Sequence, residues 1–270
     1  MKHPLARMAV VITGDFGSTP LHVAASLPSA GSNVALILAL GTPEAAVVQD
    51  RLRRTPLHVA AQNVYASGKL IKAISNLRKS AAVANTHRGH LPLHLACQSG
   101  ASNSVVRALV RVLPGSVSSR NRNGDTPLHV AVKYGASIFV VSHLIECCPE
   151  AVYIQNVTGN TSLHCATAYR ASHEVVQLLI RSWPDSVLIQ NRNGDSPLHY
   201  AACHAMPKDE TVRYLLEAAP TASLLLNRGG QSPSDKARLS HAPEDIVKIL
   251  DTAVDEWSRM AFKKVGFAQF

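Results

Sequence analysis

The stretch NRNGDTPLHV at residues 121–130 occurs again, almost unchanged, as NRNGDSPLHY at residues 191–200. A loop that forms a single active site is needed once, so near-identity at a distance indicates a structural unit that is used again. Alignment on the TPLH proline reveals further copies, which start at Thr19, Thr55, Leu91, Thr126, Thr161 and Ser196, with a degraded copy, SPSDKA, at 232–237. The steps between proline positions are 36, 36, 35, 35, 35 and 36 residues, which predicts a stack of repeats.

Each copy contains the signals of one helical hairpin. An Asn-x-x-Gly turn comes first, then a Thr or Ser that caps a helix, and then a proline suited to the first turn. The Leu and Ala residues of PLHxAA form a small apolar face, and a second helix follows with apolar pairs such as Val105-Val106 and Val140-Val141. Neither helix can bury its apolar stripe alone, so neighbouring units are expected to build one continuous core.

The T-P-L-H-x-A pattern resembles the signature of the ankyrin-repeat family, whose period is near 33 residues. The resemblance covers residues 9–256, although the units here are longer. It implies an all-α fold, an ankyrin-repeat solenoid of stacked helix-turn-helix units with β-turn or hairpin finger loops. The expected units lie near 14–49, 50–85, 86–120, 121–155, 156–190, 191–226 and 227–256.

The additional residues of each unit lie between the helices and after the second helix. A proline recurs at the latter place and is expected to stop the helix, because proline lacks the N–H and clashes with the preceding turn. These prolines are Pro43, Pro114, Pro149, Pro184 and Pro220. In the second unit Lys79 stands where other units have this proline, and Arg53 stands where most have the turn glycine. An arginine with positive φ is strained, so we expect repeat units 1 and 2 to fray first.

The last part of the chain departs from the repeat. Residues 244–264 form an amphipathic pattern that predicts a capping helix, and residues 265–270 are expected to form a short aromatic tail. The repeat pattern already runs at residue 9 without a clear polar cap. A recognition module of a longer enzyme or channel is therefore one alternative for the chain.

The sequence predicts no enzyme, cofactor or metal site. The motif histidines are spread along the repeats, so they cannot converge on one metal, and the family resemblance implies that they bond locally and to the next unit. No phosphate-binding or nucleophile motif occurs. The five cysteines show no paired spacing, which indicates a reducing compartment, and the longest apolar run is too short to span a bilayer. We expect a monomer in the cytoplasm or the nucleus.

Partner information is expected between the motif positions, on the concave face that the family resemblance implies. The finger loops carry a broken series of arginines, and the formal net charge is +9. The candidate partner-binding residues are Arg51, Arg54, Arg88, Arg122, Asp125, Lys133, Tyr134, Tyr169, Arg170, Arg192, Asp195, His204 and Arg228. Arg–carboxylate pairing favours an acidic protein segment as the partner.

The leading hypothesis is a non-catalytic scaffold or adaptor that binds another protein. The alternative is a binder of anionic surfaces or nucleic acid through the same arginines, which the scarcity of aromatic finger residues disfavours for nucleic acid. A third interpretation leaves the arginines as an ordinary solvated face, because Asp125 and Asp195 follow Arg122 and Arg192 at three residues.

Overall fold

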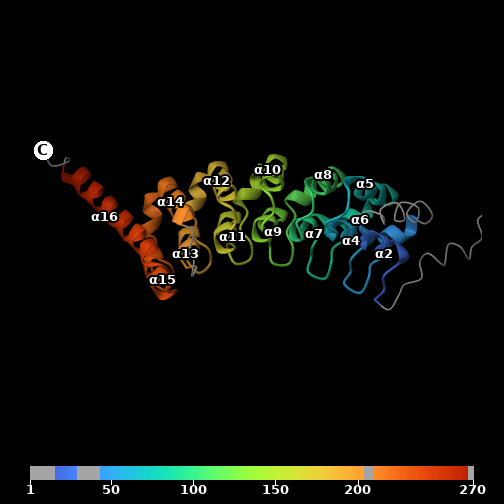
Figure 1. The fold of residues 1–270 in the computed structure, drawn as a ribbon, viewed down its shortest axis with the longest axis horizontal. Coiled ribbons are helices and arrows are strands. Elements are labelled where there is room, and N and C mark those ends of the chain that lie inside the picture. Colours follow the sequence, from blue (N-terminus) through green and yellow to red (C-terminus); the bar gives the residue numbers. More distant parts are fainter. Residues whose placement is uncertain (1–15, 29–42, 204–208, 267–270) are drawn as a thin grey trace, which may run out of the picture. The chain divides into compact units, whose positions relative to one another are not determined.

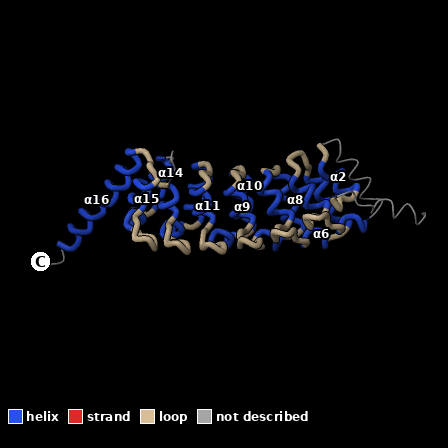
Figure 2. The backbone as a smooth tube through the Cα atoms, turned by 90° about the horizontal axis from the view of Figure 1, so that it is seen from below, coloured by secondary structure: helices blue, strands red, loops and turns tan. Residues whose placement is uncertain are grey.

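The protein is described by a computed structural model that covers residues 16–28, 43–203 and 209–266. Within these ranges the elements are helices joined by turns and loops, and no strand occurs (Figures 1 and 2). The expected all-α class is therefore confirmed.

Every copy of the motif begins a first helix. A Thr, Ser or Leu at the N-cap precedes it, and in six of the seven copies proline fills the first position. These helices are α2 (Pro20–Ser26), α4 (Pro56–Gln62), α7 (Pro92–Ser99), α9 (Pro127–Lys133), α11 (Ser162–Ala168), α13 (Pro197–Ala202) and α15 (Pro233–Leu239). The proline fits there because the first turn needs no donor from its N–H.

A second helix follows each first helix from the second unit onward. These are α5 (Gly68–Leu77), α8 (Asn103–Val112), α10 (Ile138–Cys147), α12 (His173–Ser182), α14 (Asp209–Ala218) and α16 (Glu244–Gly266). The expected apolar pairs, among them Val105 and Val106, are fully buried. The capping helix ends two residues beyond the expected range, and it buries Ile246, Val247 and Leu250. Most of the expected tail, residues 267–270, lies outside the described residues.

The recurrent proline does more than stop the second helix. It opens a short 3-10 turn, which accommodates the additional residues of these long units. The turns are η1 (Pro43–Val47), η2 (Pro114–Val117), η3 (Pro149–Tyr153), η4 (Pro184–Leu188) and η5 (Pro220–Leu224). Where Lys79 replaces the proline, the one-turn helix α6 (Ser80–Val83) fills the same place.

The chain divides into two compact units, Met1–Ala151 and Val152–Phe270. In the first unit, α2, α4, α7 and α9 pack in sequence, and α5 packs against α8. In the second, α11, α13 and α15 pack in sequence, and α12 packs against α14. The motif leucines, such as Leu57 and Leu198, are completely buried, and each contributes about 2 kcal/mol of transfer free energy.

Candidate functional site

The five-residue turn before each first helix is called a finger here. The second to seventh fingers are residues 50–54, 86–90, 121–125, 156–160, 191–195 and 227–231. In the sixth finger the Asn191 side chain accepts the backbone N–H groups of Asn193 and Asp195, at 2.9 and 3.0 Å. Gly194 takes φ 78°, as the predicted turn requires. The fingers are thus turns closed by one side chain.

Within each of the two compact units, neighbouring fingers are joined by a backbone hydrogen bond, which the residue at the arginine position donates. Arg122 donates its N–H to the Arg88 carbonyl at 3.1 Å, and Arg228 donates to the Asn193 carbonyl at 2.9 Å. Arg51 and Arg192 make the equivalent bonds at 3.0 Å. The backbone therefore fixes where these residues stand, while their side chains are exposed.

The motif histidines are structural, as expected. In α2 the Thr19 N–H donates to His22 Nδ1 at 3.1 Å, so Nε2 carries the ring proton and donates to the Arg54 carbonyl of the next finger at 2.9 Å. His94 makes the same two bonds, to Leu91 and Asp125. Burial lowers the pKa of His58 and of His94 to about 4, so the rings are neutral as this bonding requires. No cluster suited to a metal occurs within the described residues.

A groove of about 270 Å³ opens between the second and third fingers in the compact unit Met1–Ala151. Its lining residues are Leu52, Arg54, Gln62, Thr86, His87, Arg88, His90, Leu95 and Gln98. The lining has two arginines and two histidines but no carboxylate. The groove therefore offers hydrogen-bond donors to an anionic group above an apolar floor.

The two arginines of this groove are held differently. Arg54 Nε donates to the carboxylate of Asp50 at 2.8 Å, and the Asp50 side chain is almost fully buried. Arg88 is exposed and makes no ion pair with a described residue. Arg88 is thus the guanidinium with its donors available, and Arg54 is a fixed charge beside it.

The structure corrects the expectation for the two finger aspartates. Asp125 and Asp195 are only 6% and 4% exposed, so neither presents a carboxylate to a partner. Asp195 instead accepts from Asn227 at 2.9 Å and pairs with Lys236 at 3.0 Å. The next repeat covers this carboxylate, which reasoning from a single unit does not reveal.

The remaining candidates lie at or just beyond the ends of the first helices. Lys133 Nζ is 5.8 Å from the ring of Tyr134, and the Tyr134 hydroxyl accepts from Gln98 at 3.4 Å. Tyr169 and Arg170 are exposed, and Arg170 has φ 56° where the preceding unit has a glycine. His204 lies outside the described residues.

Two residues that organise the fingers were missed by the sequence reasoning. Asp50 takes the first finger position, where most other units have Asn, and Lys236 takes the variable position of the degraded motif. A charge at a normally neutral repeat position was the available signal in both places. Each proves to be a member of a buried or half-buried ion pair.

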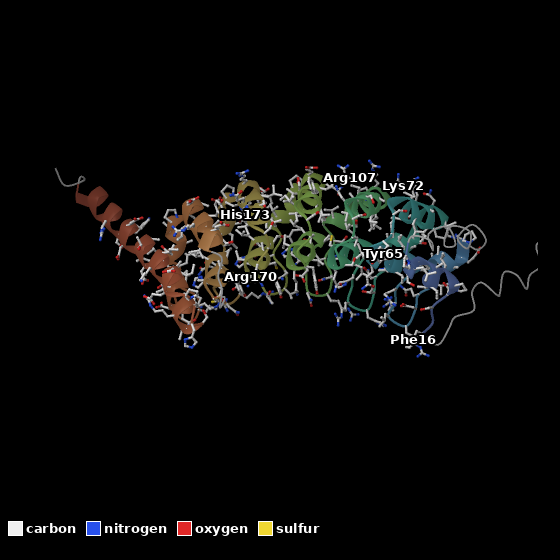
Figure 3. The ribbon with its side chains drawn as sticks, in the orientation of Figure 1. Phe16, Tyr65, Lys72, Arg107, Arg170 and His173 are labelled. Carbon is white, nitrogen blue, oxygen red and sulfur yellow. The ribbon has the colours of Figure 1, made fainter. Side chains whose placement is uncertain are left out.

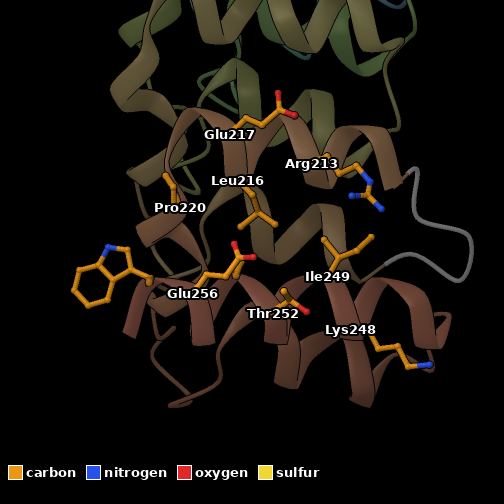
Figure 4. Close-up of a pocket in the computed structure, with 10 residues that line it drawn as sticks. Arg213, Leu216, Glu217, Pro220, Lys248, Ile249, Thr252 and Glu256 are labelled. Atoms are coloured by element: carbon orange, nitrogen blue, oxygen red, sulfur yellow. The ribbon is translucent and has the colours of Figure 1, made fainter. Parts of the chain in front are cut away.

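A second cleft, of about 520 Å³, lies between α14 and α16 (Figure 4). Leu216 and Ile249 lie between the two helices, and the rim carries charges of both signs. The charged lining residues are Arg213, Lys248, Glu217 and Glu256. Because these charges compensate one another, this cleft selects an ionic partner less clearly than the finger groove does.

Comparison with known proteins identifies the repeat. Residues 64–151 and 136–224 match the family model described as ankyrin repeats (3 copies). Among solved structures, the ankyrin repeat domain of Bcl-3, a member of the IkappaB protein family, is 26% identical with a TM-score of 0.68. That match covers 89% of this chain and 100% of the other.

The ankyrin repeat domain of human ASB11 is 22% identical with a TM-score of 0.67, over 87% of this chain and 97% of the other. A search of curated proteins finds no match. Among the described helices, none is both long and apolar enough to cross a membrane.

Proposed function

This chain belongs to the ankyrin-repeat family, and from that premise we propose that it is a non-catalytic adaptor that binds another protein on its finger and first-helix face. Ankyrin repeat domains generally mediate protein–protein interaction. The observation that carries the proposal is the carboxylate-free groove between the second and third fingers, where two arginines and two histidines surround an apolar floor.

The groove suits an acidic side chain of the partner. A carboxylate that enters it would meet the exposed guanidinium of Arg88 and the pre-oriented Arg54. Leu52 and Leu95 would contact its aliphatic part, while Gln62 and Gln98 can donate or accept at the rim. An acidic residue followed or preceded by a small apolar residue is the motif that this lining favours.

Other exposed residues would extend the contact in each unit. Arg51 and Arg122 flank the groove along the finger series, and Arg192 and Arg228 occupy the equivalent positions in the second unit. Their charges reinforce one another only weakly, because a neighbouring finger lies about one Debye length away at 0.1 M salt. We therefore expect these arginines to raise the association rate more than they lower the dissociation rate.

The runner-up function is the recognition of phosphates by the same finger arginines, which the net charge of +9 supports. A place in a longer enzyme or channel would leave the finger surface with the same role. The proposal further includes a monomer in the cytoplasm or nucleus.

The test compares two double variants of the immobilised protein. Arg54→Gln with Arg88→Gln removes the groove charges, and Lys248→Gln with Arg259→Gln removes two exposed charges from α16. Proteins retained from lysate, with and without nuclease, are identified by mass spectrometry. The proposal is supported if one protein is retained despite nuclease treatment and only the groove variant fails to retain it. Deletion of the acidic segment of that partner should also abolish its retention by the original protein. Equal retention by both variants, or retention that requires nucleic acid, overturns it.

A further inference from the structure

In the compact unit Met1–Ala151, two of the second helices, α5 and α8, carry positive charge on their outer surface without acidic residues to balance it. Helix α5 reads GKLIKAISNL and α8 reads NSVVRALVRV, so neither contains an acidic residue. Their four cations, Lys69, Lys72, Arg107 and Arg111, are all exposed. We call these four residues the α5–α8 patch.

Helical spacing and close packing bring the four cations together. Lys69 and Lys72 are three residues apart on α5, and Arg107 and Arg111 are four apart on α8, so each pair shares a helix face. At Gly68 the two helices touch, because an added Cβ would lie 2.7 Å from the Ser104 carbonyl oxygen.

Figure 3 shows Lys72 and Arg107 on the same edge of the unit, and Phe16, beside the second finger, on the opposite edge. The patch is therefore a surface separate from the finger groove. A ligand on one of the two surfaces leaves the other accessible.

The patch has no ion-pair partner among the described residues. None of its cations makes a hydrogen bond or an ion pair within the described part of the chain. The nearest acid on α10 is Glu146, which accepts from Ser142 at 2.9 Å and lies 3.9 Å from His143. The pKa of His143 is lowered by burial and, next, by Arg107, with a smaller effect of Arg111, while Glu146 acts in the opposite direction. The positive field of the patch therefore reaches the neighbouring helix.

The composition of the patch favours a phosphate surface over a protein interface. Protein interfaces are enriched in arginine but depleted in lysine, and they carry aromatic or apolar anchors at their centre. Apart from the four cations, the exposed side chains of α5 and α8 are Asn76 and Ser104, and neither helix contains an aromatic residue. The contact at Gly68 also leaves no room for a helix of a partner between α5 and α8 there.

Single-stranded nucleic acid uses stacking aromatics, which α5 and α8 lack. Mobile lipid headgroups, in contrast, can adjust to cations on a closed helix pair without a shaped groove. From these observations we propose that the α5–α8 patch binds the anionic surface of a phospholipid membrane, while the finger groove stays free for a protein partner.

The expected strength follows from the number of cations. Each Lys or Arg near an anionic leaflet strengthens binding about fivefold, so four cations together give an effect of several hundredfold. Such binding weakens as salt shortens the Debye length from about 10 Å at 0.1 M to about 3 Å at 1 M.

The experiment measures co-sedimentation with vesicles of phosphatidylcholine that contain about one-third phosphatidylserine. The test variant is K69Q/K72Q/R107Q/R111Q. A matched variant, R51Q/R122Q/R192Q/R228Q, removes the same number of charges from the fingers. A third variant, K69R/K72R/R107K/R111K, keeps the charges and changes the side chains. Circular dichroism confirms that all three fold.

The expected result is vesicle binding that the patch variant loses by at least about a hundredfold, that the charge-keeping variant retains, and that the finger variant retains largely. If the patch and finger variants lose vesicle binding equally, the binding depends only on the net charge of the protein, and the proposal is overturned. Patch-dependent binding to duplex DNA or to RNA without binding to vesicles would overturn it in favour of nucleic acid. Because the patch variant keeps the finger groove, its pull-down partner reports separately on the adaptor function.

Discussion

In the second finger the buried carboxylate belongs to Asp50, at the first position of the turn, whereas in the sixth finger it belongs to Asp195, at the last position. Asp50 accepts the N–H groups of Leu52 and Arg54 at 2.9 and 2.8 Å and pairs with Arg54. All of its bonds therefore stay within the finger.

The carboxylate of Asp195, in contrast, bonds to residues outside its own finger. Its partners Asn227 and Lys236 belong to the next repeat, so the carboxylate ties two repeats together. Asn191 meanwhile performs the turn-closing task that Asp50 performs in the second finger. The comparison shows that one backbone turn accepts a buried charge at either end, and that the position decides whether the charge stabilises a finger or a junction between repeats.

Acid tests the motif histidine that is bound to the last carbonyl of a finger, and it should have the largest effect. His22 and His164 make this bond to the second and sixth fingers. His58 and His94 make it to the third and fourth fingers. Because the pKa of His58 and His94 in the folded protein is near 4, below about 6.5 in the unfolded chain, their contribution is complete above pH 6.5 and is lost as pH falls toward 4. From pH 7.5 to pH 5 we expect a loss of about 2 kcal/mol for each histidine.

Urea unfolding at a series of pH values measures this slope. A His94→Asn variant should show a smaller slope than the original protein. An unfolding free energy that stays constant between pH 7.5 and 5 would contradict the structural role of the neutral rings.

Gly194→Ala should break the sixth finger at its junction with the seventh. The residue has φ 78°, and an added Cβ would lie 2.6 Å from the Arg228 backbone nitrogen. We expect a destabilisation of about 2–3 kcal/mol by thermal or urea unfolding. The matched control is Gly230→Ala, which has φ 71° but nothing within 4 Å, and which should cost only about 1 kcal/mol. Equal costs would show that the close approach of the fingers is unimportant.

Asp195→Asn and Asp50→Asn form a matched pair that sharpens the comparison directly. The first keeps the shape but leaves Lys236 without its anion, with an expected cost of about 1–2 kcal/mol. The second installs the residue that most other fingers have, and Arg54 is half-exposed, so the change should stay within about 0.5 kcal/mol. A larger loss from Asp50→Asn in urea unfolding would reverse the assignment of roles.

Arg53→Gly should stabilise the second finger by a small amount. Arg53 has φ 59°, a conformation that costs a residue with a Cβ about 1 kcal/mol and a glycine almost nothing. The free energy of unfolding should rise by about that amount, and hydrogen exchange in repeat units 1 and 2 should slow. If units 1 and 2 are already as protected as residues 121–190 in the original protein, the expected fraying is wrong.

The surface of the protein was only partly predictable. The recurrence of TPLH indicated the first helices, and Gly194 and Arg53 indicated where the backbone needs φ > 0, because these are properties of one short segment. The burial of Asp125 and Asp195 was not predictable in this way. Whether a residue at a finger tip reaches water depends on what the next repeat places over it.

By itself the sequence determined the capped helices and the turns that need φ > 0, since each depends on residues at most a few positions apart, and the repeat was visible as the recurrence of one motif. Only the tertiary structure decided the groove around Arg54 and Arg88 and the pairing of Asp195 with Lys236, 41 residues away. It also decided that the cations of α5 and α8 meet in one patch, because stacking at Gly68 brings the helices together. Local pattern dictates each element, whereas surface chemistry arises from side chains that become neighbours only when repeats stack.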